Sequence, residues 1–171
     1  MDVIKAKVST VFFKYSIPSV LGMLAISSAG IVDGLFIGNY VGDIGLAAIN
    51  INLPIFSILF GLSLMLAIGS SVSSGKLMGE GDIKNASLIF TKTIICISAF
   101  SFISCILLFF NTETILFLLG GNEILLYISM EYLSILLLFL PFLMIGIVLD
   151  YFVRVDNRPN LSFSALLLSA V

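Results

Sequence analysis

Four long apolar stretches, separated by short polar connections, dominate the chain. They cover residues 17–37, 49–72, 93–110 and 124–149, and a fifth begins at residue 161 and continues to residue 171. A helix over each complete stretch would be about 27–39 Å long, against a hydrocarbon core of about 30 Å. The fifth stretch is too short to cross. The pattern therefore predicts an all-α, polytopic membrane bundle of four transmembrane helices plus the start of a fifth.

The basic residues are confined to alternate connections. All eight lysines and arginines lie before the first stretch, between the second and third, or between the fourth and fifth. The other two connections, 39–48 and 111–123, contain acids and no base. Because cytoplasmic loops carry an excess of Lys and Arg, we expect a plasma-membrane protein with a cytoplasmic N-terminus. The charged residues after the fourth stretch are interpreted as topology markers: Asp150, Arg154, Asp156 and Arg158.

Composition supports the membrane interpretation and narrows the function. The chain is 60% hydrophobic and 11% charged, whereas soluble domains carry about 25% charged residues. A net charge of −2 with no basic stripe gives no indication of nucleic-acid binding. The chain has no histidine, and Cys96 and Cys105 are expected on opposite faces of one helix. We therefore expect no enzyme, no metal site and no disulfide.

Asp33 is a carboxylate inside the first apolar stretch. At the centre of a membrane helix an Asp costs roughly 2.5–3.5 kcal/mol, and such residues usually face a cavity or a partner. Asp33 lies about 28 Å along the helix from Lys14, in the outer half of the span. It is interpreted either as an interior site for an ion or a proton, or as a side chain that reaches the outer interface.

Glycines recur every fourth residue beside Asp33, at Gly30, Gly34, Gly38 and Gly42. On one helix they would form a narrow small-residue face that lets another helix approach closely. At 100° per residue, Asp33 flanks this face. We predict that the four glycines pack against another helix.

Other polar residues and prolines interrupt the second and fourth stretches. Asn50 and Asn52 lie at the outer end of the second, where they would cap the helix or face a substrate path. Pro54 and Pro141 are expected inside helices, where they bend the axis. The bends are read as structural features or as gating points.

Glu131 is the second acid at membrane depth, with Tyr132 beside it and Tyr127 one turn earlier. These three side chains would form a polar patch on a substrate path, or reach the outer interface, where Tyr is enriched.

Several segments, in order, resemble the MATE multidrug and toxin extrusion transporters. The segment Ile31–Gly42 (IVDGLFIGNYVG), followed by GLAAI at 45–49, is similar to the first-helix signature of that family. Further similar segments are GSS at 69–71 with GEGD at 79–82, YL at 132–133 with Pro141, and RVDNRP at 154–159.

This resemblance implies the N-terminal part of the first six-helix lobe of a twelve-helix antiporter. Such proteins exchange Na⁺ or H⁺ for bulky, often cationic drugs. Asp33 matches the first-helix carboxylate that many members use as an ion-coupling group. The family's partners for that acid come largely from helices five and six. The implied partners are therefore the lipid bilayer, an organic cation or drug, and helices five to twelve of a parent or a partner chain.

Two alternatives stay open. A lipid-linked sugar flippase of the same superfamily would need a cationic central cavity, and no Lys or Arg lies deep in the apolar stretches. The other alternative is an inactive truncated fragment, or a half-protein that needs a partner chain, because four and a part helices cannot form two alternating lobes.

Overall fold

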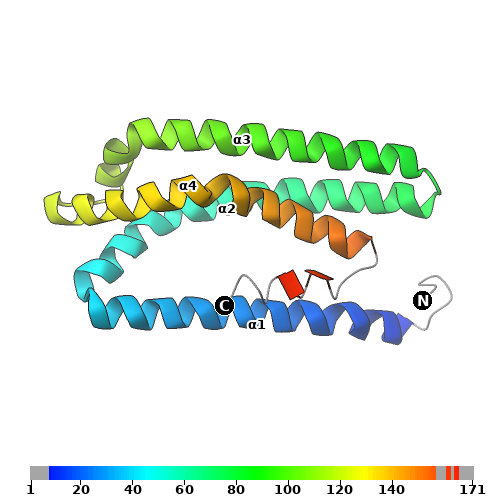
Figure 1. Ribbon diagram of the computed structural model, residues 1–171, viewed down its shortest axis with the longest axis horizontal. Helices are drawn as coiled ribbons and strands as arrows, with labels where there is room; N and C mark the ends of the chain where they lie inside the picture. Colours follow the sequence, from blue (N-terminus) through cyan, green and yellow to red (C-terminus); the bar gives the residue numbers. More distant parts are fainter. Residues whose placement is uncertain (1–7, 157–160, 163, 166–171) are drawn as a thin grey trace.

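Four long α-helices make up the protein (Figure 1). The computed structural model describes residues 8–156, 161–162 and 164–165. The helices are α1 (Val8–Tyr40), α2 (Asp43–Gly79), α3 (Ile83–Leu118) and α4 (Glu123–Val155). All four contain spans long and apolar enough to cross a membrane, which confirms the four predicted helices. Residues 161–162 and 164–165 are helical too, while 163 and 166–171 of the expected fifth helix lie outside the described residues.

The helices are longer than the apolar stretches indicated. With 37 residues, α2 is about 55 Å long, far more than a bilayer core of about 30 Å. Hydropathy marks only the part of a helix that lies in hydrocarbon, whereas polar caps set where the helix begins. Asp82 accepts a hydrogen bond from the backbone N–H of Asn85 at 3.1 Å, and Asn122 accepts one from that of Leu125 at 2.9 Å. The connections shrink accordingly to residues 41–42, 80–82 and 119–122.

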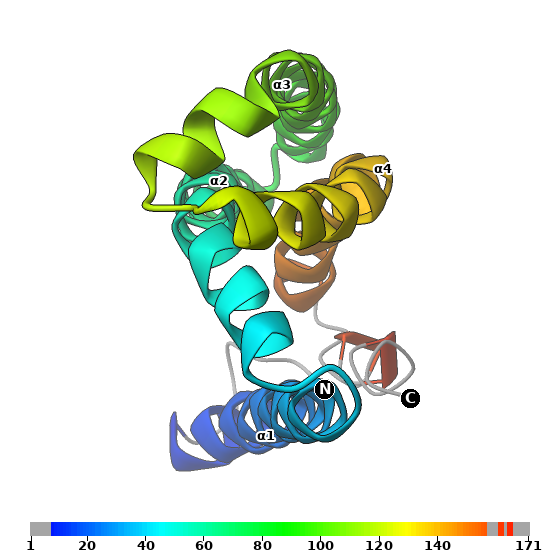
Figure 2. The same ribbon diagram turned by 90° about the vertical axis from the view of Figure 1, so that its left-hand side faces the viewer.

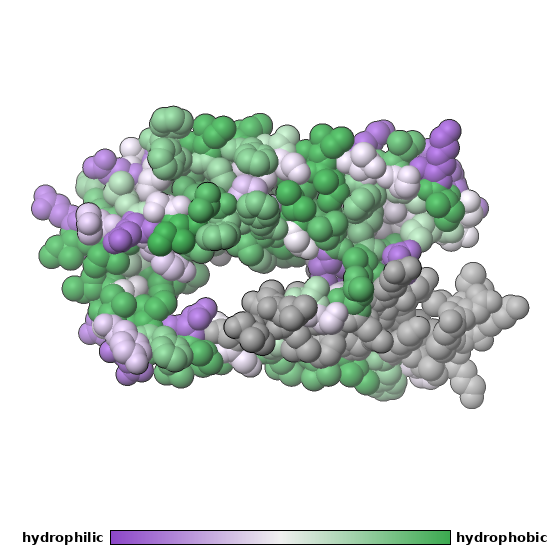
Figure 3. Space-filling model, in the orientation of Figure 1, coloured by the Kyte–Doolittle hydropathy of each residue, from purple (hydrophilic) through white to green (hydrophobic). Residues whose placement is uncertain are grey.

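Three of the helices form a packed unit, and α1 stands apart from it. Helices α2, α3 and α4 all contact one another, whereas α1 contacts only α2 among these four helices. Viewed end-on, the first turns of α2 bridge the distance from α1 to the packed unit (Figure 2). On the face shown in Figure 3, apolar side chains cover the middle of the molecule and polar ones gather toward its two ends. This distribution suits a chain that crosses a bilayer.

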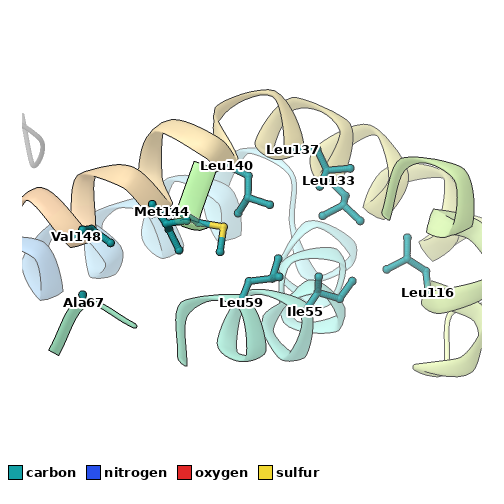
Figure 4. Packing of buried hydrophobic residues seen from close by; sticks show 10 residues of the cluster. Ile55, Leu59, Ala67, Leu116, Leu133, Leu137, Leu140, Met144 and Val148 are labelled. Carbon is teal, nitrogen blue, oxygen red and sulfur yellow. The ribbon is translucent and has the colours of Figure 1, made fainter. Parts of the chain in front are cut away.

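The packed unit is built from large side chains on α4 and small ones on its neighbours. Leu133, Leu137, Leu140, Met144 and Val148 form a buried row along α4 (Figure 4). The buried row of α2 includes Ala48, Ser63, Ala67, Ser71 and Ser74, and that of α3 includes Ala86, Thr93, Ser101 and Ser104. Small residues let helix backbones approach closely in a membrane. The small-residue seam of the structure therefore lies on α2 and α3.

Both predicted internal prolines lie within helices, Pro54 in α2 and Pro141 in α4. Figure 1 shows that α2 is bent in its N-terminal third and α4 near its middle. A proline has no N–H for the carbonyl four residues earlier, so Pro141 leaves the carbonyl of Leu137 without its helical donor. The thiol of Cys105 on α3 donates a hydrogen bond to that carbonyl, with Sγ 3.2 Å from the oxygen. Cys105 therefore has a polar partner on the neighbouring helix.

Candidate functional site

Asp33 lies near the end of α1, with an exposed side chain. Figure 3 shows an opening between α1 and the packed helices, called here the lateral opening. Within the described residues, helix α1, which carries Asp33, is not in contact with α4, which carries Tyr132. The two predicted site residues therefore lie on separate helices, and their pairing stays a prediction.

The glycine ladder is only partly a packing surface. At Gly30 and Gly34 an added Cβ would meet no atom within 4 Å among the described residues, so their packing role stays a prediction. Gly38 does contact α2, since its added Cβ would lie 3.4 Å from Leu46 Cδ1. Gly42 was wrongly placed on the helix: α1 ends at Tyr40, and Gly42 has a φ of 79° in the turn before α2. Glycine suits that turn because it tolerates positive φ.

Asn52 is fully buried between α2 and α4. Its Nδ2 donates to the carbonyl of Ala48 at 2.8 Å and to that of Ser129 at 3.4 Å. Its Oδ1 has no hydrogen-bond partner among the described residues. Asn52 lies nine residues into α2, so a capping role is wrong. It joins two helices, as polar side chains do in membranes, and does not line the lateral opening.

The remaining predicted residues have separate environments. Asn50 has an exposed side chain on α2, as do Glu131 and Tyr127 on α4. Tyr132 is half-buried. Since neighbouring residues on a helix point about 100° apart, Glu131 and Tyr132 do not share one face.

The serines near the C-terminal end of α2 form two kinds of hydrogen bond. Ser70 and Ser73 donate to carbonyls one turn earlier, those of Leu66 and Gly69. Ser74 instead donates across to the carbonyl of Ala86 on α3 at 3.2 Å. The recurrence of small residues at 63, 67, 71 and 74 is the signal that could have identified this seam.

A cavity of about 370 Å³ lies where the C-terminal ends of α2 and α4 meet the N-terminal end of α3. It is lined mostly by apolar side chains, among them Met78, Phe90, Leu149 and Phe152. The rings of Phe90 and Phe152 meet edge to face, with centroids 5.0 Å apart. The cavity is a feature of helix packing, and it lies at the ends of the three helices, away from Asp33.

Comparison with known proteins identifies the family. Residues 18–171 match MatE, which is nine-tenths of the chain. The chain belongs to the MatE family. This finding confirms the resemblance seen in the sequence. The four-helix unit also superposes on the outward-facing conformation of a multidrug resistance MATE family transporter of the MOP superfamily, with a TM-score of 0.90. That structure is 19% identical and matches over 98% of this chain and 37% of its own, so it supports the fold.

Curated relatives are similar over almost the whole of this MatE chain. The multidrug export protein MepA of Staphylococcus saprophyticus is 30% identical over 168 residues, 98% of this chain and 37% of MepA. MepA of Staphylococcus aureus strain MSSA476 is 26% identical over 165 residues, 96% of this chain and 37% of MepA. The chain therefore spans little more than a third of the length of these relatives.

Proposed function

We propose that this MatE chain supplies the ion-coupling carboxylate, Asp33, of a multidrug efflux transporter that exchanges Na⁺ or H⁺ for an organic cation or drug. The observation that carries the proposal is the Asp33 carboxylate itself, an exposed charge inside the apolar span of α1, on a helix that does not contact α4 within the described residues. Multidrug export is what the MepA relatives are named for. These relatives are longer than this chain, so further ligands to the ion would come from the parts of the protein that the chain does not cover.

The physical basis of coupling is the cost of enclosing a bare carboxylate. While Asp33 is charged, bringing α1 against α4 would remove it from water, at a cost of roughly 2.5–3.5 kcal/mol on insertion scales. A proton or Na⁺ neutralises the carboxylate and removes most of that cost, and the Tyr132 hydroxyl offers a polar contact. Ion binding thus favours the closed arrangement, and ion release favours the open one. Drug is moved against its gradient only if it binds the two arrangements differently.

The test is ion-driven ethidium efflux by the complete protein in membrane vesicles. Asp33→Asn, which keeps the shape and removes the charge, should lower efflux at least about tenfold, within the usual range of coupling energies. Tyr132→Phe should weaken the response to the coupling ion while efflux remains measurable.

Glu113→Gln is the matched control, because this acid on α3 is exposed and belongs to none of the candidate sites. It should leave efflux unchanged. Membrane insertion of all three variants is verified by carbonate extraction. Full ion-coupled efflux by a correctly inserted Asp33→Asn variant would refute the proposed role.

A further inference from the structure

Three side chains form a closed ring at the C-terminal end of α4. Arg154 Nη2 lies 2.6 Å from Asp150 Oδ2, and Arg154 Nε donates a hydrogen bond to Ser162 Oγ at 3.0 Å. The Ser162 hydroxyl in turn donates to Asp150 Oδ1. Each of the three residues therefore contacts the other two. Asp150 and Arg154 belong to α4, whereas Ser162 belongs to the helical residues that follow it.

Burial separates this ring from an ordinary surface ion pair. The side chains of Arg154 and Asp150 are 21% and 16% exposed, and Ser162 is 4% exposed. The chain offers a direct comparison on α2, where Lys76 and Glu80 have the same four-residue spacing. That pair is 79% and 57% exposed, with 4.0 Å between the charged atoms. Exposed pairs of that kind contribute little to stability, whereas breaking a shielded, hydrogen-bonded pair leaves a charge without compensation.

The geometry suits a guanidinium. Arginine presents several N–H donors in one rigid plane, whereas lysine presents its donors from a single nitrogen at the end of a flexible chain. Here one N–H group of Arg154 binds the carboxylate and another binds the hydroxyl. The guanidinium carbon also lies 5.4 Å from the centroid of the Tyr151 ring, a favourable cation–π distance. The rigid plane makes these contacts at a smaller cost in side-chain entropy than an ammonium would.

We propose that Asp150, Arg154 and Ser162 form a clasp that fixes the start of the next helical segment to the inner half of α4. The clasp joins residues twelve positions apart and lies on the C-terminal side of the Pro141 bend. The inner half of α4 and the residues around Ser162 then move as one body when α4 flexes at Pro141. Arg154 acts through its shape, beyond the topology role that its charge suggested.

The two roles of Arg154 make opposite predictions for Arg154→Lys in the complete protein. A topology marker needs only a positive charge, so lysine would serve equally well. Lysine keeps the charge but loses the two N–H groups that the rigid guanidinium holds apart, so the thermal unfolding midpoint in detergent should fall. A shift of up to about 2–4 °C is expected for each hydrogen bond lost, at about 1 kcal/mol a bond, and less the longer the complete protein is. Ser162→Ala should lower the midpoint similarly, and Ser162→Thr, which keeps the hydroxyl, should largely restore it.

Lys76→Gln serves as the matched control, since it breaks the exposed pair on α2 and should leave the midpoint unchanged. The double variant Arg154→Lys with Ser162→Ala should lower the midpoint by less than the sum of the two single falls, because both substitutions break the same ring. An Arg154→Lys protein as stable as the wild type, or strictly additive losses in the double variant, would overturn the proposal.

Discussion

At the residue scale, the turn between α1 and α2 depends on the absence of a side chain at Gly45. A Cβ added there would lie 2.6 Å from Val41 Cγ1 and 2.7 Å from Val41 Cβ. Such distances require Val41 to move. Because Val41 lies in the turn itself, the angle between α1 and α2 depends on this glycine.

We expect Gly45→Ala to destabilise the protein by about 1–3 kcal/mol, the usual cost of overpacking. Gly61→Ala is the matched control on the same helix, because its added Cβ would meet no atom within 4 Å among the described residues. Alanine there should be neutral or slightly favourable, by up to about 1 kcal/mol from helix propensity. Thermal unfolding in detergent measures both, and a Gly45→Ala variant as stable as Gly61→Ala would contradict the steric argument.

Individual residues also show where sequence reasoning stops. Asp33 could be singled out because a charge in an apolar stretch is visible locally, and Tyr132 because it lies beside Glu131, a second acid at membrane depth. The burial of Asn52 against Ser129 could not be predicted, since it depends on which faces of α2 and α4 meet. The bond between Ser162 and Asp150 depends likewise on how the chain returns after α4.

At the element scale, the bend of α4 involves a neighbouring helix. Pro141 deprives the Leu137 carbonyl of its helical donor, and Cys105 on α3 supplies a replacement. An unsatisfied carbonyl is costly in a bilayer, where no water can replace the lost bond. The bend could be predicted from Pro141 alone. That Cys105 donates to the Leu137 carbonyl could not, because it depends on how α3 and α4 pack together.

Cys105→Ala should therefore destabilise the protein by about 1–3 kcal/mol, the cost of an unsatisfied buried polar group. Cys105→Ser should retain most of the stability, because a hydroxyl is also a donor. Cys96 is exposed on the same helix, so Cys96→Ala should have no effect. The free energy of unfolding in mixed micelles distinguishes these variants. Equal stability of the Ala and Ser variants at 105 would show that the hydrogen bond contributes nothing.

At the scale of the whole molecule, helix number and family followed from the sequence, while the arrangement of the helices did not. Apolar stretches identify the spans because membrane helices must satisfy their own backbone. They do not show which helices pack together. The conspicuous glycines of α1 suggested a seam there, whereas the buried small residues lie on α2 and α3.

Orientation in the membrane is open to direct measurement. The distribution of lysines predicts that the connection at 80–82 is cytoplasmic and the one at 119–122 is external. Green fluorescent protein fused after Gly81 should fluoresce, and alkaline phosphatase fused after Gly121 should be active. Exchanging the two reporters should abolish both signals. Active phosphatase after Gly81 would reverse the predicted orientation.

The limited contact of α1 has a consequence for the order of assembly. Helix α1 is synthesised before α2, α3 and α4, yet among these helices it contacts only α2. Helices α2 to α4 can associate into a unit once α4 enters the bilayer, since they bury one another's small and large side chains. We therefore expect α1 to remain largely surrounded by lipid during synthesis, and to acquire its final neighbours after the three helices that follow it.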